Sequence, residues 1–462
     1  MTAAMMRGGA HRSSRTRGAH AAPGRGRRLS ASIGQTGIAP AVARTAGFNI
    51  VVTGAAGFAG LLLTRAVGPS VRGEYAAIVA WFGVLTLVGG LGQQAALCFY
   101  VSSDPQRARD YVATSRAMML VMGAVAIVGG MYLAPILGHG RPEVTDGYRL
   151  AFGTSIVAFT AAAYTYSLQA RDLRKWNQVR AVQPVLALIS IGVLWRLGRL
   201  SLESALLVLA ATLLLQLGWA YRCCRAAGLA PGRTRAALIR PLTVYGVAQL
   251  AALAPGTVNA QLDQIVLSQT VAPAELGRYA IAVSLSLLSL PLVSAIGYVA
   301  FPRLAAQREA AEDTRELQRI AVLSSAGIAV AVLVPLGLVA YWLVPLAFGA
   351  GYAGAVPLLW ILTPGAVFLA CGQVVGDLLR GRNRPMAVAW AQGVAAVFTV
   401  LLLLLLLPLV GVYGAAIAST IAYGLALAAM LRCLWRIPHT DAAPTGPETP
   451  PAQEKVLTRR SS

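Results

Sequence analysis

The chain has 462 residues, of which 57% are hydrophobic and 12% charged, and its formal net charge is +22. Soluble domains carry about 25% charged residues, so this composition excludes an ordinary soluble protein and indicates a polytopic membrane protein. Only two of the 39 basic residues are lysines, and the arginines cluster between apolar runs. That pattern orients membrane proteins and argues against binding of nucleic acid.

Both ends of the chain are polar. Residues 1–43 hold seven arginines and are far too long for the n-region of a cleavable signal, so we expect a disordered basic cytoplasmic tail that touches anionic lipid. Residues 437–462 are rich in Pro, Thr and Glu and predict a second disordered cytoplasmic tail.

Between these tails, twelve apolar runs have the length and composition of membrane-spanning helices. They are 47–64, 76–97, 117–137, 150–168, 179–195, 205–219, 241–262, 279–301, 320–348, 355–375, 385–407 and 412–434. The sequence therefore predicts an all-α polytopic membrane protein with about 12 transmembrane helices. We expect an N-lobe at 44–221, a cytoplasmic linker at 222–240 and a C-lobe at 241–436.

Basic residues are divided unevenly between the two sides that this topology defines. The two tails and the loops after the even-numbered spans hold 32 of the 39 Lys and Arg residues, and the other loops hold 7. Because basic loops stay in the cytoplasm, we expect a multi-pass protein of the plasma (inner) membrane with both termini cytoplasmic.

An internal repeat relates the two expected lobes. The segment VGPSVRGEYA at 67–76 and the segment VAPAELGRYA at 271–280 share Val, Pro, Gly, Tyr and Ala at identical spacing. The copies begin six spans apart, which predicts two parallel six-helix lobes, an arrangement typical of transporters. We expect Gly73 and Gly277 to lie at equivalent outer turns where a side chain would obstruct the backbone.

Few residues suit catalysis. Neither lysine follows a glycine, so no phosphate-binding loop of the Walker type exists, and none of the four histidines lies within an expected span. The cysteine spacings fit no zinc site. Loop acids such as Glu74, Glu143 and Asp146 are scattered, which disfavours a membrane glycosyltransferase. We expect no enzyme activity, no cofactor and no metal.

Polar residues at membrane depth are the candidate binding residues, because a charge there costs about 2.5–3.5 kcal/mol by insertion scales and usually faces a cavity. The candidates lie in the first, second, seventh and eighth spans or beside them. They are Arg65, Arg72, Gln93, Gln94, Asn259, Gln261, Asp263 and Arg278. We expect Asp263 to line a central cavity and to pair with a cation, with Arg65 and Arg278 as its natural partners.

Several segments together resemble the polysaccharide-transporter (O-antigen-type flippase) family of the multidrug/oligosaccharidyl-lipid/polysaccharide exporter superfamily. These segments are LTRAVGPSVRGEYA at 63–76, LDQIVLS at 262–268, LGRYAIA at 276–282, FPRL at 301–304 and LRGRNRP at 379–385. The resemblance covers about residues 44–436. It implies two six-helix lobes around a central cavity that opens to one side of the membrane at a time.

The resemblance also implies a function, which is to move a lipid-linked oligosaccharide or polysaccharide precursor from the inner to the outer leaflet by alternating access. The implied partners are a polyprenyl-linked sugar, membrane lipid, and glycosyltransferases or a polymerase that act on the same precursor. A cation-coupled multidrug exporter of the same superfamily is the alternative. A major-facilitator transporter is disfavoured because the loop after the second span lacks that family's usual Gly/Asp/Arg pattern.

Overall fold

The computed structural model describes residues 38–294, 311–382 and 384–436, and these residues are helical apart from short connections. The chain divides after Arg44 into a short first unit and a second unit that carries everything discussed below. The two predicted tails lie almost wholly outside the described residues, although 38–43 are already helical. The motif at 301–304 also lies outside them.

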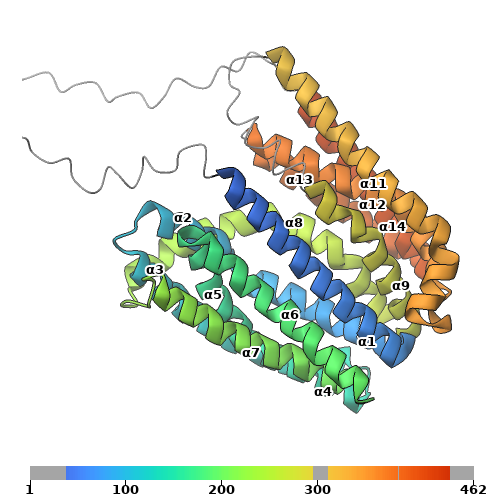
Figure 1. The fold of residues 1–462 in the computed structure, drawn as a ribbon, viewed down its shortest axis with the longest axis horizontal. Helices are drawn as coiled ribbons and strands as arrows, with labels where there is room; N and C mark the ends of the chain where they lie inside the picture. Colours follow the sequence, from blue (N-terminus) through green and yellow to red (C-terminus); the bar gives the residue numbers. More distant parts are fainter. Residues whose placement is uncertain (1–37, 295–310, 383, 437–462) are drawn as a thin grey trace, which may run out of the picture. The chain divides into compact units, whose positions relative to one another are not determined.

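The first half of the chain contains seven helices (Figure 1). They are α1 (Ile38–Gly89), α2 (Gln93–Ser103), α3 (Ala108–Leu137), α4 (Pro142–Gly153), α5 (Ser155–Arg171), α6 (Leu173–Arg196) and α7 (Leu202–Ala226). Local sequence explains several boundaries. Asp172 caps α6 by accepting from the N–H groups of Arg174 and Lys175 at 3.1 and 3.2 Å, and Ser201 forms a capping box with Ser204 at the start of α7.

The described part of the second half begins with α8 (Ala236–Thr270) and α9 (Pro273–Ser286), which a 3₁₀ turn follows. The remaining helices are α11 (Ala311–Phe348), α12 (Ala355–Gly381), α13 (Pro385–Val410) and α14 (Val412–Trp435). Prolines at the first position start α9 and α13, where the missing N–H is not needed.

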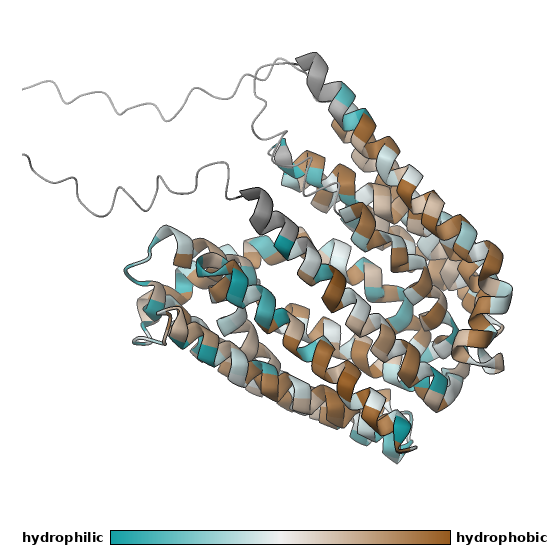
Figure 2. Ribbon diagram, viewed as in Figure 1, coloured by the Kyte–Doolittle hydropathy of each residue, from teal (hydrophilic) through white to brown (hydrophobic). Residues whose placement is uncertain are grey.

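The predicted fold class is confirmed, because the expected spans fall on helices. The second span also crosses the turn at 90–92, and the eighth runs past the described residues. Ten described helices are long and apolar enough to cross a membrane. Ten helices rather than twelve qualify for two reasons. The first two expected spans share α1, which kinks at Gly68 (φ 75°), and the fourth expected span is divided between α4 and α5. Hydrophobic residues recur along all the helices drawn in colour (Figure 2).

Buried apolar residues of the second unit form four cores, and the largest of them joins many helices of both halves. The joined core contains Ile78 and Tyr148 of the first half together with Leu276, Tyr352 and Val412 of the second. These residues lie toward the same end of the helical bundle as the two repeat segments, 67–76 and 271–280. Toward the opposite ends, one core unites α2, α3, α5 and α7 with the start of α8, and another unites α11 to α14.

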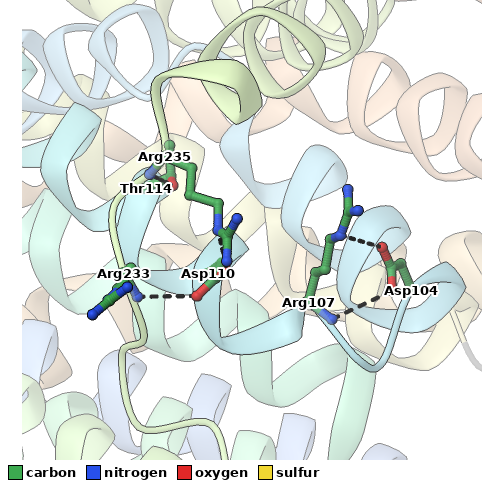
Figure 3. A network of polar contacts seen from close by, with 6 residues as sticks. All are labelled: Asp104, Arg107, Asp110, Thr114, Arg233 and Arg235. Carbon is green, nitrogen blue, oxygen red and sulfur yellow. Dashed lines mark hydrogen bonds and ion pairs between the residues drawn. The ribbon is translucent and has the colours of Figure 1, made fainter.

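The connector between α7 and α8 is tied to the start of α3 (Figure 3). Asp110 accepts from the backbone N–H of Arg233 at 3.0 Å and from Nε of Arg235 at 2.5 Å, while the N–H of Arg235 donates to the Thr114 hydroxyl at 3.0 Å. In the same loop region, Gly232 donates to the carbonyl of Arg109 at 2.9 Å. The link between the halves is therefore held against the first half.

Candidate functional site

A buried carboxylate lies at the centre of the second half. Asp263 of α8 is 3% exposed, and its Oδ2 accepts hydrogen bonds from the hydroxyl of Tyr279 on α9 and from Ser419 Oγ on α14, the latter at 3.3 Å. Its Oδ1 accepts from the N–H of Gln264 at 2.7 Å. Hydroxyl and backbone donors from three helices thus replace the water that a buried carboxylate loses.

The expected pairing of Asp263 with Arg65 or Arg278 is therefore wrong. Arg65 Nη1 donates to the carbonyls of Leu346 and Ala347 at 2.6 and 3.2 Å, and Arg278 Nε donates to the carbonyl of Gly351 at 3.1 Å. The last carbonyls of a helix lack intrahelical partners and carry negative partial charge, so the end of α11 attracts guanidinium groups. Both arginines fasten the connection between α11 and α12.

A second buried polar contact and a small cavity lie near the Asp263 carboxylate. Asn259, one turn before Asp263 on α8, is 3% exposed and accepts from the Thr399 hydroxyl of α13 at 2.6 Å. A cavity of about 40 Å³ lies beside Asp263 and is also lined by Ser419 and Tyr423. That volume accommodates about one water-sized species.

The candidate glutamines have unequal surroundings. Gln93 is 2% exposed, accepts from Ser115 Oγ at 2.8 Å and donates to the carbonyl of Leu242 at 3.5 Å. Gln261 lies against Gly83, where an added Cβ would come within 2.7 Å of its Oε1. Both therefore contact the opposite half of the chain, whereas Gln94 is exposed.

Among the residues predicted to bind substrate, Arg72 has the surroundings best suited to an anionic ligand. It follows the kink of α1 and is only partly exposed, its Nε donates to Thr64 Oγ1 at 3.1 Å, and its guanidinium carbon lies 5.8 Å from the Tyr75 ring centroid. Within the described ranges, no carboxylate comes within 4.0 Å of it. A half-buried cation without a counter-charge can attract an anion from outside the chain.

The two repeat turns pack against each other. A Cβ on Gly73 would lie 1.8 Å from the carbonyl oxygen of Pro273, and a Cβ on Gly277 would lie 2.0 Å from that of Pro69. The contact is reciprocal, because each glycine meets the proline of the other copy. Both glycines are helical, so close approach rather than an unusual backbone angle requires them, as small residues allow at helix crossings.

Tyr279, Ser419 and Thr399 are not among the site residues that the sequence predicts. Tyr279 could have been found, because it is the tyrosine that the second repeat copy shares with the first, where it matches Tyr75. At the same offset, Asp263 corresponds to Ala59, so only the second half carries the acid. Ser419 and Thr399 lie in apolar helices far along the chain and gave no sequence signal.

Comparison with known proteins gives the family and the fold. Residues 45–307 match the family described as polysaccharide biosynthesis protein. No curated protein sequence matches the chain. A structure described as the lipid II flippase MurJ in an inward closed conformation aligns with a TM-score of 0.72 and 12% identity, and covers 85% of this chain and 88% of its own.

Two further structures of the MOP superfamily are similar. An inward-facing MATE multidrug transporter aligns with a TM-score of 0.71 and 13% identity, covering 83% of this chain and 93% of its own. A transporter from Pyrococcus furiosus aligns at 0.62 and 12% identity, over 86% and 95% of the two chains. The chain belongs to the polysaccharide biosynthesis protein family and has the fold of MOP superfamily transporters.

Proposed function

We propose that the protein moves a lipid-linked oligosaccharide or polysaccharide precursor from the inner to the outer leaflet of the plasma membrane by alternating access. Family membership supports this function, and so does the likeness in fold to a lipid II flippase. The observation that carries the proposal is the distribution of the buried cores. Helices of both halves share a core at the repeat-turn ends. Toward the opposite ends, α11 to α14 form a core of their own and only the start of α8 packs with the first half, as expected of two bundles that separate on one side at a time.

The chemistry of the substrate explains why a protein is needed. A sugar headgroup cannot cross hydrocarbon unaided, because its hydroxyls would lose their hydrogen bonds to water. A hydrated path between the two halves removes that cost. Membrane potential can supply energy, because each negative charge moved out of an inside-negative cell gains about 2.3 kcal/mol per 100 mV.

We place the side with the repeat turns outside the cell. The uneven division of basic residues supports this orientation, with both termini and the connector between α7 and α8 in the cytoplasm. In this orientation the joined core closes the outer side, and the substrate enters from the cytoplasmic side.

We assign the headgroup phosphate to Arg72, because it is half-buried and has no carboxylate partner in the described chain. Gln93, Asn259, Gln261 and Asp263 hold the surrounding helices in place, while Gln94 is free to contact sugar hydroxyls. Arg65 and Arg278 set the position of the α11–α12 connection beside them.

The function can be tested in the native host. Without the gene, the lipid-linked precursor should accumulate where an external glycosidase cannot reach it in intact spheroplasts. The wild-type chain should restore access, Arg72→Lys should restore part of it, and Arg72→Gln should restore about tenfold less, as loss of a charged contact predicts. Full access without the gene would contradict the proposal.

A cation-coupled multidrug exporter is the second candidate, because the second half holds a buried carboxylate beside a small cavity and the fold resembles a MATE transporter. Expression in an efflux-deficient host distinguishes the two functions. We expect no change in resistance to cationic drugs, and a broad rise in resistance would favour the exporter.

A further inference from the structure

The connection between α11 and α12 of the second half is docked on α1 of the first half. The hydroxyl of Tyr352, in this connection, donates to the carbonyl of Thr64 at 3.2 Å, and the two residues are 1% and 0% exposed. Arg65 Nη1 donates to the carbonyls of Leu346 and Ala347, just before the connection, at 2.6 and 3.2 Å. These contacts of Thr64 and Arg65 hold the two halves together at the repeat-turn ends, and we call them the latch.

The kink of α1 explains why the latch forms at this point. Gly68 has a φ of 75°, and Pro69 has no N–H to donate to the carbonyl of Arg65, one turn earlier. The last turn before the kink therefore offers carbonyls to partners outside the helix. Gly351 allows the close approach of the connection, since a Cβ there would lie 3.2 Å from Cγ of Pro69.

The second repeat has no charged counterpart of the latch. At the repeat spacing, Gln269 of α8 matches Arg65, and Ser268 matches Thr64. The Gln269 amide donates to the Ser268 hydroxyl at 3.1 Å, and that hydroxyl also accepts from Nε1 of Trp81 at 3.1 Å. The latch is therefore one-sided, and Arg65 supplies its cation.

Thr64 also contacts the arginine to which the headgroup phosphate is assigned. Its Oγ1 accepts from Arg72 Nε at 3.1 Å, while its carbonyl accepts from the hydroxyl of Tyr352. A phosphate accepts a stronger hydrogen bond from a guanidinium than a neutral hydroxyl does. A phosphate bound to Arg72 therefore competes with the Thr64 hydroxyl, and movement of Arg72 away from Thr64 acts on the same turn that holds Tyr352.

We infer that Thr64 couples the phosphate site to the latch, so that a diphosphate bound at Arg72 weakens the Tyr352–Thr64 contact and favours separation of the halves at the repeat-turn ends. A ligand shifts a conformational equilibrium only through unequal affinity for the two states. Arg72 provides this inequality, because Thr64 shares it in the closed state and releases it in the open one. The role of Arg72 rests on the proposed function, whereas the latch does not.

Pulsed electron paramagnetic resonance on the full chain in phosphatidylcholine nanodiscs tests this inference. Spin labels at Glu143 of α4 and Leu409 of α13 report the separation of the halves, because both positions are exposed and lie beside the joined core. Attachment through p-acetylphenylalanine spares the five native cysteines. Undecaprenyl diphosphate should add a longer-distance population, and neutral undecaprenol should not. An unchanged distance distribution with undecaprenyl diphosphate would overturn the coupling.

Two variants test the latch and the coupling separately. Tyr352→Phe keeps the ring and should raise the longer-distance population roughly fivefold without ligand, as loss of one hydrogen bond predicts. Tyr148→Phe is the matched control, because Tyr148 is also 1% exposed in the joined core and its hydroxyl makes no hydrogen bond to any described residue. Thr64→Val keeps the carbonyl that accepts from Tyr352 but removes the hydroxyl, so undecaprenyl diphosphate should no longer lengthen the distance.

These measurements require no transport, so the two proposals can fail separately. Equal ligand-free distances in Tyr352→Phe and Tyr148→Phe would overturn the latch, and a full response of Thr64→Val to undecaprenyl diphosphate would overturn the coupling. A wild-type chain that responds to the diphosphate but never exposes headgroups would contradict the proposed function and leave the coupling standing. Normal headgroup exposure without any response of the distance to the diphosphate would overturn the coupling alone.

Discussion

Asp263 shows how a single buried charge is accommodated in this fold. The position that matches it in the first half is Ala59, so the acid has no counterpart there. Burial of a carboxylate is costly unless donors satisfy it, and Tyr279, Ser419 and the backbone of Gln264 do so. The residue joins α8, α9 and α14 into one unit.

Removal of this carboxylate should therefore destabilise the second half. Asp263→Ala leaves the hydroxyls of Tyr279 and Ser419 without their acceptor, at about 1–3 kcal/mol for each unsatisfied group. We expect a lower melting temperature in detergent, while Asp263→Asn, which keeps the shape and one acceptor oxygen, should lose less stability. Asp146→Ala is the control, because that side chain is 68% exposed. Identical melting of all three variants would show that the buried contacts contribute nothing.

At the scale of helices, hydropathy predicts where a span lies but not how spans are joined. It placed the first span on a helix, yet α1 runs through this span and most of the second with only a kink at Gly68, and the second expected span continues past the end of α1 at Gly89 into α2. It also missed the break at Thr154 between α4 and α5, because only Thr154 and Ser155 interrupt the apolar run there. Partners such as Ser419 could not be predicted, since a hydroxyl in an apolar run carries no sign of its tertiary contact.

The crossing of α1 and α9 at the repeat turns depends on the absence of side chains. Gly73→Val and Gly277→Val would force each side chain into a backbone carbonyl of the other copy, and we expect about 1–3 kcal/mol of destabilisation and a lower folded yield. Gly57→Val on α1 is the matched control, because an added Cβ there meets nothing within 4 Å. Yields equal to the control, measured by size-exclusion chromatography, would contradict the close contact.

The connector between α7 and α8 should loosen when its anchor is lost. Asp110 is 16% exposed in its ion pair with Arg235, and it also receives the N–H of Arg233. Asp110→Ala should therefore speed tryptic cleavage at these arginines roughly tenfold. The control is Asp104→Ala, which removes a nearby acid that pairs with Arg107 at 4.0 Å and does not contact the connector (Figure 3). Equal cleavage of both variants would show that the connector is held by other contacts.

At the scale of the whole transmembrane region, the internal repeat accounts for the location of the contacts between the halves. The two repeat copies meet at Gly73 and Gly277, within the ends where one apolar core joins both halves. Alternating access requires this joined core to separate while the opposite ends come together. If the proposed function holds, the glycine contact should break and re-form as the two halves separate at these ends.

The direct test of this account is a headgroup-exposure assay with purified protein in vesicles that contain a fluorescent polyprenyl diphosphate sugar. If the protein moves this lipid, an impermeant quencher should reach the whole lipid pool, and an inside-negative potential should speed outward movement. Arg72→Gln should slow exposure, and Gly218→Phe on α7, where an added Cβ meets nothing within 4 Å, should not. Quenching confined to the outer-leaflet pool, as in empty vesicles, would contradict the claim that this chain is a lipid-linked sugar flippase.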